Sequence, residues 1–270
     1  MVSNIKDKLG TKNEVTWCPG CPNFMILESV KRAMSELIDS KKYSQNDFAM
    51  ATGIGCHAKI FDYLNISGIY GLHGRTIPTA LGIKLGNPKL KVLAFTGDGD
   101  SYAEGMAHFI HNFRYNSDMT LFVHNNQAFS LTTGQPTPTS QKGYVSKASP
   151  CGEIDSPFNP IKLALAAGAT FIARANAMDI EHTKQIMKKA IEHKGFSYVE
   201  ILQKCLIFNK EMNDINKLMY KIQKDNSNLE KAETLANEWD YNSKTGKIPL
   251  GVIYQTIKPT LEEKMKNAQK

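Results

Sequence analysis

The sequence lacks any long apolar run, which excludes a membrane-spanning helix and argues against a signal peptide. We therefore expect a protein of the cytoplasm, with no membrane partner. Cysteine is scarce and odd in number: Cys18, Cys21, Cys56, Cys151 and Cys205 are spread over 270 residues. Five scattered cysteines make a poor disulfide framework, so we expect reduced thiols that serve metals or chemistry.

The sequence also lacks an arginine-rich or aromatic-rich binding module. Its formal net charge is +7, but the lysines are dispersed, so nucleic acid is not an expected partner. The charge indicates either a solvated lysine-rich surface or steering of an acidic partner or polyphosphate ligand. No internal repeat or low-complexity segment is present. The length allows a full hydrophobic core in one or two domains.

Apolar segments rich in β-branched residues predict six buried parallel strands, at residues 48–54, 68–72, 91–96, 119–124, 169–175 and 196–202. Helical patterns alternate with them, at residues 23–40, 78–86, 103–115 and 179–193. This alternation predicts an α/β fold with a doubly wound, mainly parallel sheet. Ligands of such sheets bind beyond the carboxyl ends of the strands.

Two stretches fall outside this alternation. Residues 127–160 are rich in proline, serine, threonine and glycine, and form either a functional loop or a disordered one. After Phe208 the composition shifts to lysine, asparagine and glutamate. We expect residues 1–208 to form the ligand-binding α/β domain that carries the cysteines. Residues 209–270 would be a mainly helical extension packed on it.

Polar motifs follow two of the predicted strands. The strand at 91–96 ends in Gly97-Asp98-Gly99-Asp100, and the strand at 119–124 ends in Asn125-Asn126. Asp98 and Asn126 should therefore lie side by side, where carboxylate and amide oxygens suit Mg²⁺. Glycines allow close approach of a diphosphate to the backbone. A lone Gly-Asp-Gly is often a turn without ligand, but two such strand ends are more specific.

Four cysteines fit one metal centre. Cys18 and Cys21 form a CxxC pair, while Cys56 and Cys205 each follow a predicted strand. Four thiolates hold either a structural Zn²⁺ or a [4Fe–4S] cluster, and the spacing leaves both interpretations open, as well as no metal. Cys151 has no partner in this scheme and is interpreted as a loop thiol.

These motifs together resemble the β subunits of 2-oxoacid:ferredoxin oxidoreductases. The matching stretches occur in the family's order: residues 17–21 (WCPGC), 53–56 (GIGC), 72–75 (LHGR), 97–100 (GDGD), 125–126 (NN) and Cys205. Residues 155–174, 193–209 and 248–254 are also similar, so the resemblance covers nearly the whole chain. It favours the [4Fe–4S] cluster over zinc.

The resemblance implies specific site residues, since GDGD with NN is similar to the diphosphate motif of thiamine-diphosphate enzymes. Mg²⁺ would be held by Asp98, Asn126 and the backbone carbonyl of Ala128, and the cluster by Cys18, Cys21, Cys56 and Cys205. Thiamine diphosphate would contact Ile54, Gly55, Cys56, His57, His73, Gly99, Asp100 and Ser130. His57 and His73 are candidate catalytic acid–base groups, or equally structural histidines.

The resemblance also implies an activity. The expected reaction is the coenzyme A-dependent oxidative decarboxylation of a 2-oxoacid (pyruvate, 2-oxoglutarate or a broad range) to acyl-CoA and CO2. Electrons would pass through the cluster to ferredoxin. A separate α subunit, or a fused γ-α chain, would form a heterodimer with this chain and bring the pyrimidine-binding domain and the activating glutamate.

One stretch departs from the family pattern. Residues 130–135 read SLTTGQ, where the family often reads GLTKGQ. Ser130 replaces a glycine and Thr133 replaces a lysine, and loss of that cation disfavours a second carboxylate such as that of 2-oxoglutarate. Two alternatives stay open. One is a subunit of a non-oxidative thiamine-diphosphate decarboxylase or synthase, and the other is a zinc-stabilised scaffold protein.

Overall fold

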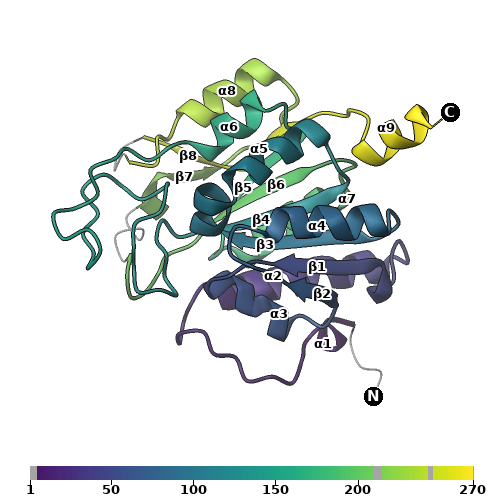
Figure 1. The fold of residues 1–270 in the computed structure, drawn as a ribbon, viewed down its shortest axis with the longest axis horizontal. Coiled ribbons are helices and arrows are strands. Elements are labelled where there is room, and N and C mark those ends of the chain that lie inside the picture. The colour runs from purple at the N-terminus through teal and green to yellow at the C-terminus, as the bar shows by residue number, and fades with distance from the viewer. Residues whose placement is uncertain (1–4, 210–214, 243–245, 270) are drawn as a thin grey trace.

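Three layers make up the chain in a computed structural model, which describes residues 5–209, 215–242 and 246–269. A central sheet is covered by helices on both faces (Figure 1). This is the predicted α/β architecture, and it arises because the central strands bury both of their faces against apolar helix stripes.

The sheet has eight strands among the described residues, in the order β2-β1-β3-β4-β6-β5-β8-β7. Neighbours from β2 through β5 are parallel, whereas β8 runs antiparallel to β5. The strands are β1 (Phe48–Thr52), β2 (Ser67–Tyr70), β3 (Lys91–Gly97), β4 (Met119–Asn125), β5 (Phe171–Asn176), β6 (Ser197–Leu202), β7 (Met219–Lys221) and β8 (Ile248–Gln255).

The helices connect these strands and cover the sheet. They are α1 (Ile5–Lys8), α2 (Asn23–Asp39), α3 (Ile60–Tyr63), α4 (Thr76–Gly86), α5 (Met106–Tyr115), α6 (Pro160–Ala166), α7 (Ile180–Glu192), α8 (Leu229–Asn237) and α9 (Leu261–Ala268). Side chains cap several of them: Asn159 accepts from Lys162 N, and Asp179 accepts from His182 N. Such caps satisfy backbone donors that have no partner within the helix.

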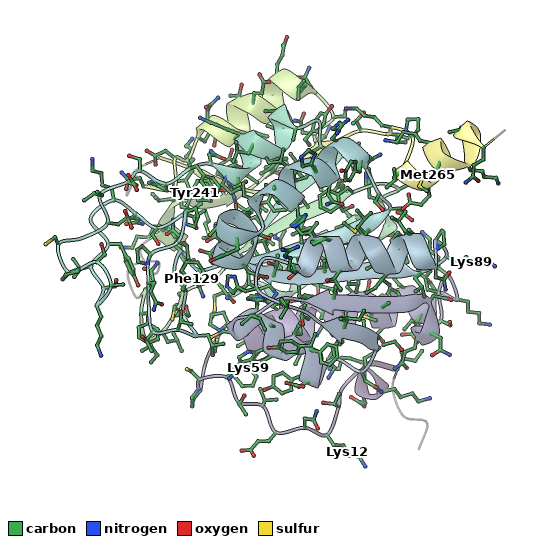
Figure 2. The ribbon with its side chains drawn as sticks, viewed as in Figure 1. Lys12, Lys59, Lys89, Phe129, Tyr241 and Met265 are labelled. Carbon is green, nitrogen blue, oxygen red and sulfur yellow. The ribbon has the colours of Figure 1, made fainter. Side chains whose placement is uncertain are left out.

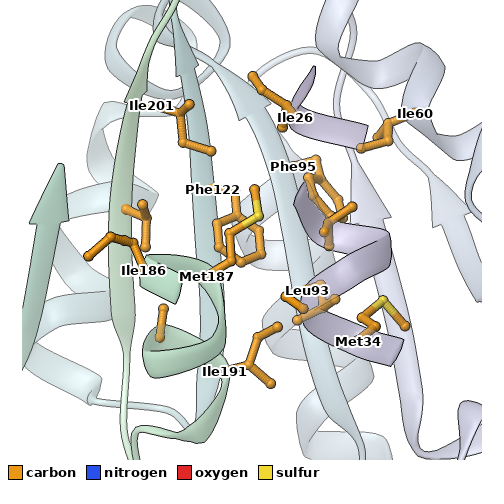
Figure 3. Packing of buried hydrophobic residues seen from close by; sticks show 14 of the residues in the cluster. Ile26, Met34, Ile60, Leu93, Phe95, Phe122, Ile186, Met187, Ile191 and Ile201 are labelled. Atoms are coloured by element: carbon orange, nitrogen blue, oxygen red, sulfur yellow. The ribbon is translucent and has the colours of Figure 1, made fainter. Parts of the chain in front are cut away.

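One half of the core lies between the sheet and the pair α2 and α7 (Figure 3). Met34 from α2 and Met187 from α7 pack with Phe95 and Phe122 of the central strands. A second cluster fills the other face, under α4, α5, α6 and α8. Burial of each large aliphatic side chain contributes roughly 1.5–3 kcal/mol, so both faces anchor the strand ends that carry the motifs.

All six predicted strands are present, with ends within two residues of the prediction. The prediction that all six are buried is wrong for β2, because β2 is an outer strand of the sheet with a partner on one side. Its residues are exposed, and Ile69 keeps 49% of its surface accessible. The helix predicted from residue 103 begins at Met106, after a short π-helical segment η3 (Asp100–Glu104).

The C-terminal stretch contributes strands as well as helices. β8 adds to the sheet beside β5, and α8 and α9 follow the predicted helical character. The division at residue 208 stays a prediction, and residues 1–4, 210–214, 243–245 and 270 of the two predicted units lie outside the described residues. Among the described helices, none is long and apolar enough to cross a membrane. The cytoplasmic location stays a prediction.

Candidate functional site

The predicted site residues gather at the carboxyl ends of the parallel strands. β3 and β4 pair with Gly97 opposite His124, so the residues that follow each strand are neighbours. Phe129, which follows β4, and Lys59, which follows β1, lie at the same end of the molecule, opposite Lys89 before β3 (Figure 2). The doubly wound topology therefore brings the sequence motifs to one edge of the sheet.

Asp98 is a buried carboxylate at this edge. The hydroxyls of Thr137 and Thr139 donate to its Oδ2 at 2.6 and 3.1 Å. Burial raises the pKa of Asp98 to about 6, although both hydroxyls and the backbone N–H of Asn126 lower it. The two hydroxyls hold the Asp98 carboxylate in a fixed orientation, and no cationic side chain is among the causes of its pKa shift. Such a carboxylate suits the binding of a cation.

The loop after β4 is organised around Asn126. Its Oδ1 accepts from Ala128 N at 3.1 Å, and its Nδ2 donates to Ser130 Oγ at 3.0 Å. Asn209 Nδ2 holds the Asn126 carbonyl at 3.0 Å. Gln127 has a φ of 55°, which turns the backbone sharply after the strand. Three of the residues implied in Mg²⁺ and cofactor binding thus share one hydrogen-bonded turn.

Asp100 connects this edge to two other loops. Its carboxylate accepts from Gly74 N at 2.5 Å, Thr76 Oγ1 at 2.9 Å and Thr96 Oγ1 at 2.6 Å. His57 Nε2 lies 3.5 Å from Asp100 Oδ2, and His73 Nδ1 lies 3.7 Å from Oδ1.

The surroundings of Asp100 keep it ionised. Burial raises its pKa, but hydrogen bonding and charge from His57, together with Thr96 and Gly74, bring it down to about 2. A Cβ on Gly53 would collide with this carboxylate, so the approach requires glycine there. Asp100 therefore ties the loops that carry both candidate catalytic histidines to the diphosphate motif.

One cavity is lined by every residue implied in thiamine diphosphate or Mg²⁺ binding; we call it the cofactor cavity. These residues are Ile54, Gly55, Cys56, His57, His73, Asp98, Gly99, Asp100, Asn126, Ala128 and Ser130. Their individual roles stay predictions. His124, Phe129, Leu131, Thr132 and Gln203 also line it and were not predicted. His124 and Gln203 stand at the ends of β4 and β6, so the strand-end rule is a signal that could have found them.

The four cysteines line a second, adjacent cavity of about 280 Å³, which we call the cysteine cavity. Cys18 and Cys21 precede α2, Cys56 begins the short helix η2 (Cys56–Lys59), and Cys205 follows β6. Residues common to both cavities are Cys56, Asn126, Ser130, Leu131 and Gln203. The two cavities thus share a wall.

The thiols influence one another. Burial raises the pKa of Cys56 to about 11, and the nearby Cys21, Cys205 and Cys18 contribute in the same direction. All five cysteines are free thiols, and Cys151 is exposed and lines neither cavity. In the described part of the chain, no three His, Cys, Asp or Glu side chains stand close enough to hold a single metal ion.

The proline-rich stretch is ordered around this site. Residues Thr137, Thr139 and Ser140 are buried, and Ser140 Oγ donates to the Gln127 carbonyl at 2.6 Å. This arrangement favours the functional-loop alternative. Thr137 and Thr139 were missed because they lie in the irregular loop after β4, and their contact with Asp98 leaves no local pattern in the sequence.

Comparisons with known proteins give a consistent picture. A family model described as "Thiamine pyrophosphate enzyme, C-terminal TPP binding domain" matches residues 53–201, and a model of the C-terminal region of the pyruvate ferredoxin oxidoreductase beta chain matches residues 205–270. The 2-oxoacid:ferredoxin oxidoreductase subunit beta of Saccharolobus solfataricus is 40% identical over 259 residues, 88% of this chain and 81% of the relative. The 2-oxoglutarate synthase subunit KorB of Archaeoglobus fulgidus is 40% identical over 206 residues, 76% of this chain and 75% of the relative.

A solved structure agrees over the full length. The 2-oxoglutarate:ferredoxin oxidoreductase from Magnetococcus marinus, with 2-oxoglutarate, coenzyme A and succinyl-CoA bound, has a TM-score of 0.92 and 34% sequence identity. The alignment covers 100% of this chain and 91% of that chain. The similarity therefore concerns the whole described fold as well as the local motifs.

Proposed function

The chain belongs to the β subunits of the 2-oxoacid:ferredoxin oxidoreductases, and from this premise we propose that it binds both thiamine diphosphate with Mg²⁺ and a [4Fe–4S] cluster. The observation that carries the proposal is the shared wall between the cofactor cavity and the cysteine cavity. When bound, the cofactor supplies an electron sink for decarboxylation of a 2-oxoacid, and the cluster takes up single electrons.

Mg²⁺ is held by Asp98, Asn126 and the carbonyl of Ala128 in this proposal. The buried Asp98 carboxylate supports it, because a pKa of about 6 marks a charge that a bound cation would balance. The donor set of oxygens suits Mg²⁺. Gly99 lines the cofactor cavity, and glycine is required there because a Cβ would collide with the Phe129 ring.

His57 and His73 are the candidate catalytic groups. Both imidazoles lie near the Asp100 carboxylate, and both line the cofactor cavity. Their place on the wall of this cavity supports a role toward its ligand, while Nε2 of His57 faces the Asp100 carboxylate. Asp100 holds His57 in place, whereas the carboxylate nearest to His73 Nδ1 is that of Glu104 at 3.1 Å. The Asp100 carboxylate is already engaged by protein donors.

The cluster assignment rests on the chemistry and spacing of the thiols. Four cysteines line one cavity, yet no three of the described metal-ligating side chains are close enough for a single ion. Four thiolates can each bind a different iron of a [4Fe–4S] cluster, and relatives named as ferredoxin oxidoreductase β subunits support this assignment over zinc. The four cysteines in one cavity weigh against the non-oxidative enzyme, because its reaction requires no iron–sulfur cluster.

The chain acts with a partner in this proposal. An α subunit, alone or fused to a γ chain, supplies the pyrimidine-binding domain and the activating glutamate. Coenzyme A takes the acyl group, ferredoxin takes the electrons, and the complex is an oxidoreductase. The names of the relatives, each a β subunit of a ferredoxin oxidoreductase or a synthase subunit, support this division.

The substrate is a 2-oxoacid with one carboxylate, such as pyruvate, in our proposal. No lysine or arginine is found among the described residues that line the cofactor cavity. Lys59 and Lys204 line the cysteine cavity instead, and the family lysine is replaced by Thr133. A second carboxylate would therefore lack a cationic partner from this chain.

The test is anaerobic co-purification with the α subunit, followed by reduction of a viologen dye with several 2-oxoacids and coenzyme A. We expect a brown protein with about four irons and acid-labile sulfide per β chain, and dye reduction that requires coenzyme A. A colourless protein with one zinc, or CO2 release without dye reduction, would overturn the proposal in favour of one of the two alternatives.

A further inference from the structure

Asn23 and His124 form a buried pair whose contacts the proposed function does not use. Asn23 is the first residue of α2, directly after the CxxC segment, and His124 lies near the end of β4. Each keeps 1% of its surface accessible. His124 Nδ1 and Asn23 Oδ1 are 2.9 Å apart, a hydrogen bond between segments a hundred residues apart in the sequence.

This hydrogen bond fixes which atoms face each way. An amide oxygen can only accept, so His124 Nδ1 carries the proton and donates it. The Asn23 Nδ2 group then points away from His124, and it is buried without a hydrogen-bond partner in the described structure. A buried donor left unsatisfied costs about 1–3 kcal/mol, which indicates that a ligand outside the protein completes it.

The two residues face different cavities. Asn23 lines the cysteine cavity, and His124 lines the cofactor cavity. The unpartnered Nδ2 donor of Asn23 thus belongs to a residue on the wall that also carries the four cysteines.

His124 is held rigidly behind this amide. Its ring packs edge-on against Phe95, with centroids 6.2 Å apart, and lies 6.0 Å from the ring of His57. Its Nε2 is also buried without a partner among the described residues, on the side of the cofactor cavity. The pair thus spans the wall between the two cavities.

We propose that Asn23 is a positioning residue whose amide N–H donates to a sulfur of the iron–sulfur cluster, and that His124 orients this amide from the cofactor side. Hydrogen bonds to cluster sulfurs are among the factors that set the reduction potential. A donor stabilises the reduced cluster more than the oxidised one, because the reduced cluster carries more negative charge. The inference rests on the proposed function, since it needs a cluster in the cysteine cavity.

The test compares the wild-type αβ complex with Asn23→Leu and His124→Phe. Iron and sulfide are counted first, and the midpoint potential is then measured by an anaerobic titration monitored by electron paramagnetic resonance. Asn23→Leu shifts the midpoint to more negative values, and His124→Phe gives a smaller shift in the same direction. Asn112→Leu is the matched control, because Asn112 is a similarly buried amide in α5 that lines neither cavity. Its midpoint equals that of the wild type.

The outcomes distinguish the presence of the cluster from the hydrogen bond that Asn23 donates to it. A wild-type complex without iron contradicts the proposed function. A complete cluster with an unchanged midpoint in Asn23→Leu contradicts the inference alone. If Asn23→Leu loses its iron, the His124→Phe variant decides. An unchanged midpoint with full iron content contradicts the role of the Asn23–His124 pair, and a negative shift supports it.

Discussion

Asp98 and Asp100 stand two residues apart in one motif, yet their pKa values shift in opposite directions. Burial dominates at Asp98 and raises its pKa to about 6. Burial also acts on Asp100, but His57, Thr96 and Gly74 outweigh it and lower the pKa to about 2. The different groups around the two carboxylates thus give them different pKa values and suit them to different roles. Asp98 is left for the cation of our proposal, while the charge of Asp100 is balanced by protein donors.

Replacement of Asp98 by asparagine is predicted to separate binding from stability. We expect thiamine diphosphate affinity to fall by more than about 100-fold, since even an outer-shell partner of a metal is worth 10–100-fold. Calorimetric titration with Mg²⁺ present measures this loss. The iron content should not change, because Asp98 does not line the cysteine cavity.

The same variant should gain stability without cofactor. The pKa of Asp98 in the folded chain lies above its ordinary value of 3.8, so its contribution to stability falls as the pH rises from about 4 to 6. Without cofactor, Asp98→Asn should therefore be more stable than wild type at pH 7, by up to about 3 kcal/mol, with little difference near pH 4. Urea unfolding at both pH values measures this, and an equal deficit at both would contradict the assignment.

Replacement of Thr133 by lysine is predicted to admit a second carboxylate. Thr133 is exposed in the loop that borders both cavities and has a φ of 80°, a conformation that strains a β-branched residue. We expect kcat/KM for 2-oxoglutarate to rise about tenfold and that for pyruvate to change little. Thr133→Gln, which is long but neutral, is the control, and an equal gain in both variants would exclude the charge as the cause.

At the scale of elements, the cysteine cavity depends on contacts between segments far apart in the chain. Trp17, beside the CxxC pair, donates from its indole Nε1 to the Cys56 carbonyl at 2.7 Å. Its ring packs edge-on against Phe24 of α2 and Tyr63 of α3. The indole therefore ties the first two cysteines to the loop after β1.

Trp17→Phe is predicted to loosen this connection while retaining aromatic packing. Loss of the hydrogen bond should cost about 1 kcal/mol and make iron release to a chelator several times faster. Absorbance of the iron–chelator complex follows the release. Trp239→Phe is the matched control, since the Trp239 indole N–H has no partner in the described structure. Identical release rates in the two variants would contradict the tethering role.

At the scale of the whole molecule, the sheet topology and the net positive charge together place basic residues beside the cysteine cavity. The parallel strands bring all the motifs to one edge, and Lys59 and Lys204 stand beside the cysteine cavity within a chain of formal charge +7. A basic surface near an electron exit favours an acidic carrier protein, because long-range attraction accelerates encounter.

Reduction of an acidic ferredoxin by the αβ complex is predicted to slow as salt rises. We expect kcat/KM for ferredoxin to fall about tenfold between low and high ionic strength, as screening shortens the range of attraction. Stopped-flow measurement over a salt series tests this. A cationic viologen provides the control, because its reduction gains nothing from a basic surface. Salt-independent ferredoxin kinetics would remove the electrostatic argument.

The sequence by itself determined the layered α/β fold, the six strands from β1 to β6 and the motif residues that line the two cavities. These were predictable because hydrophobic periodicity marks each strand, and strand ends in a parallel sheet meet at one edge. The GDGD and NN motifs and the four cysteines all follow local patterns of this kind.

Only the tertiary structure decided the contacts that give these residues their properties. It placed Thr137 and Thr139 on Asp98, joined Asn23 to His124, and gave β2 an exposed edge and β8 an antiparallel partner. These contacts join segments separated by tens to hundreds of residues. They depend on the path of irregular loops and on shape complementarity, for which no periodic pattern in the sequence exists.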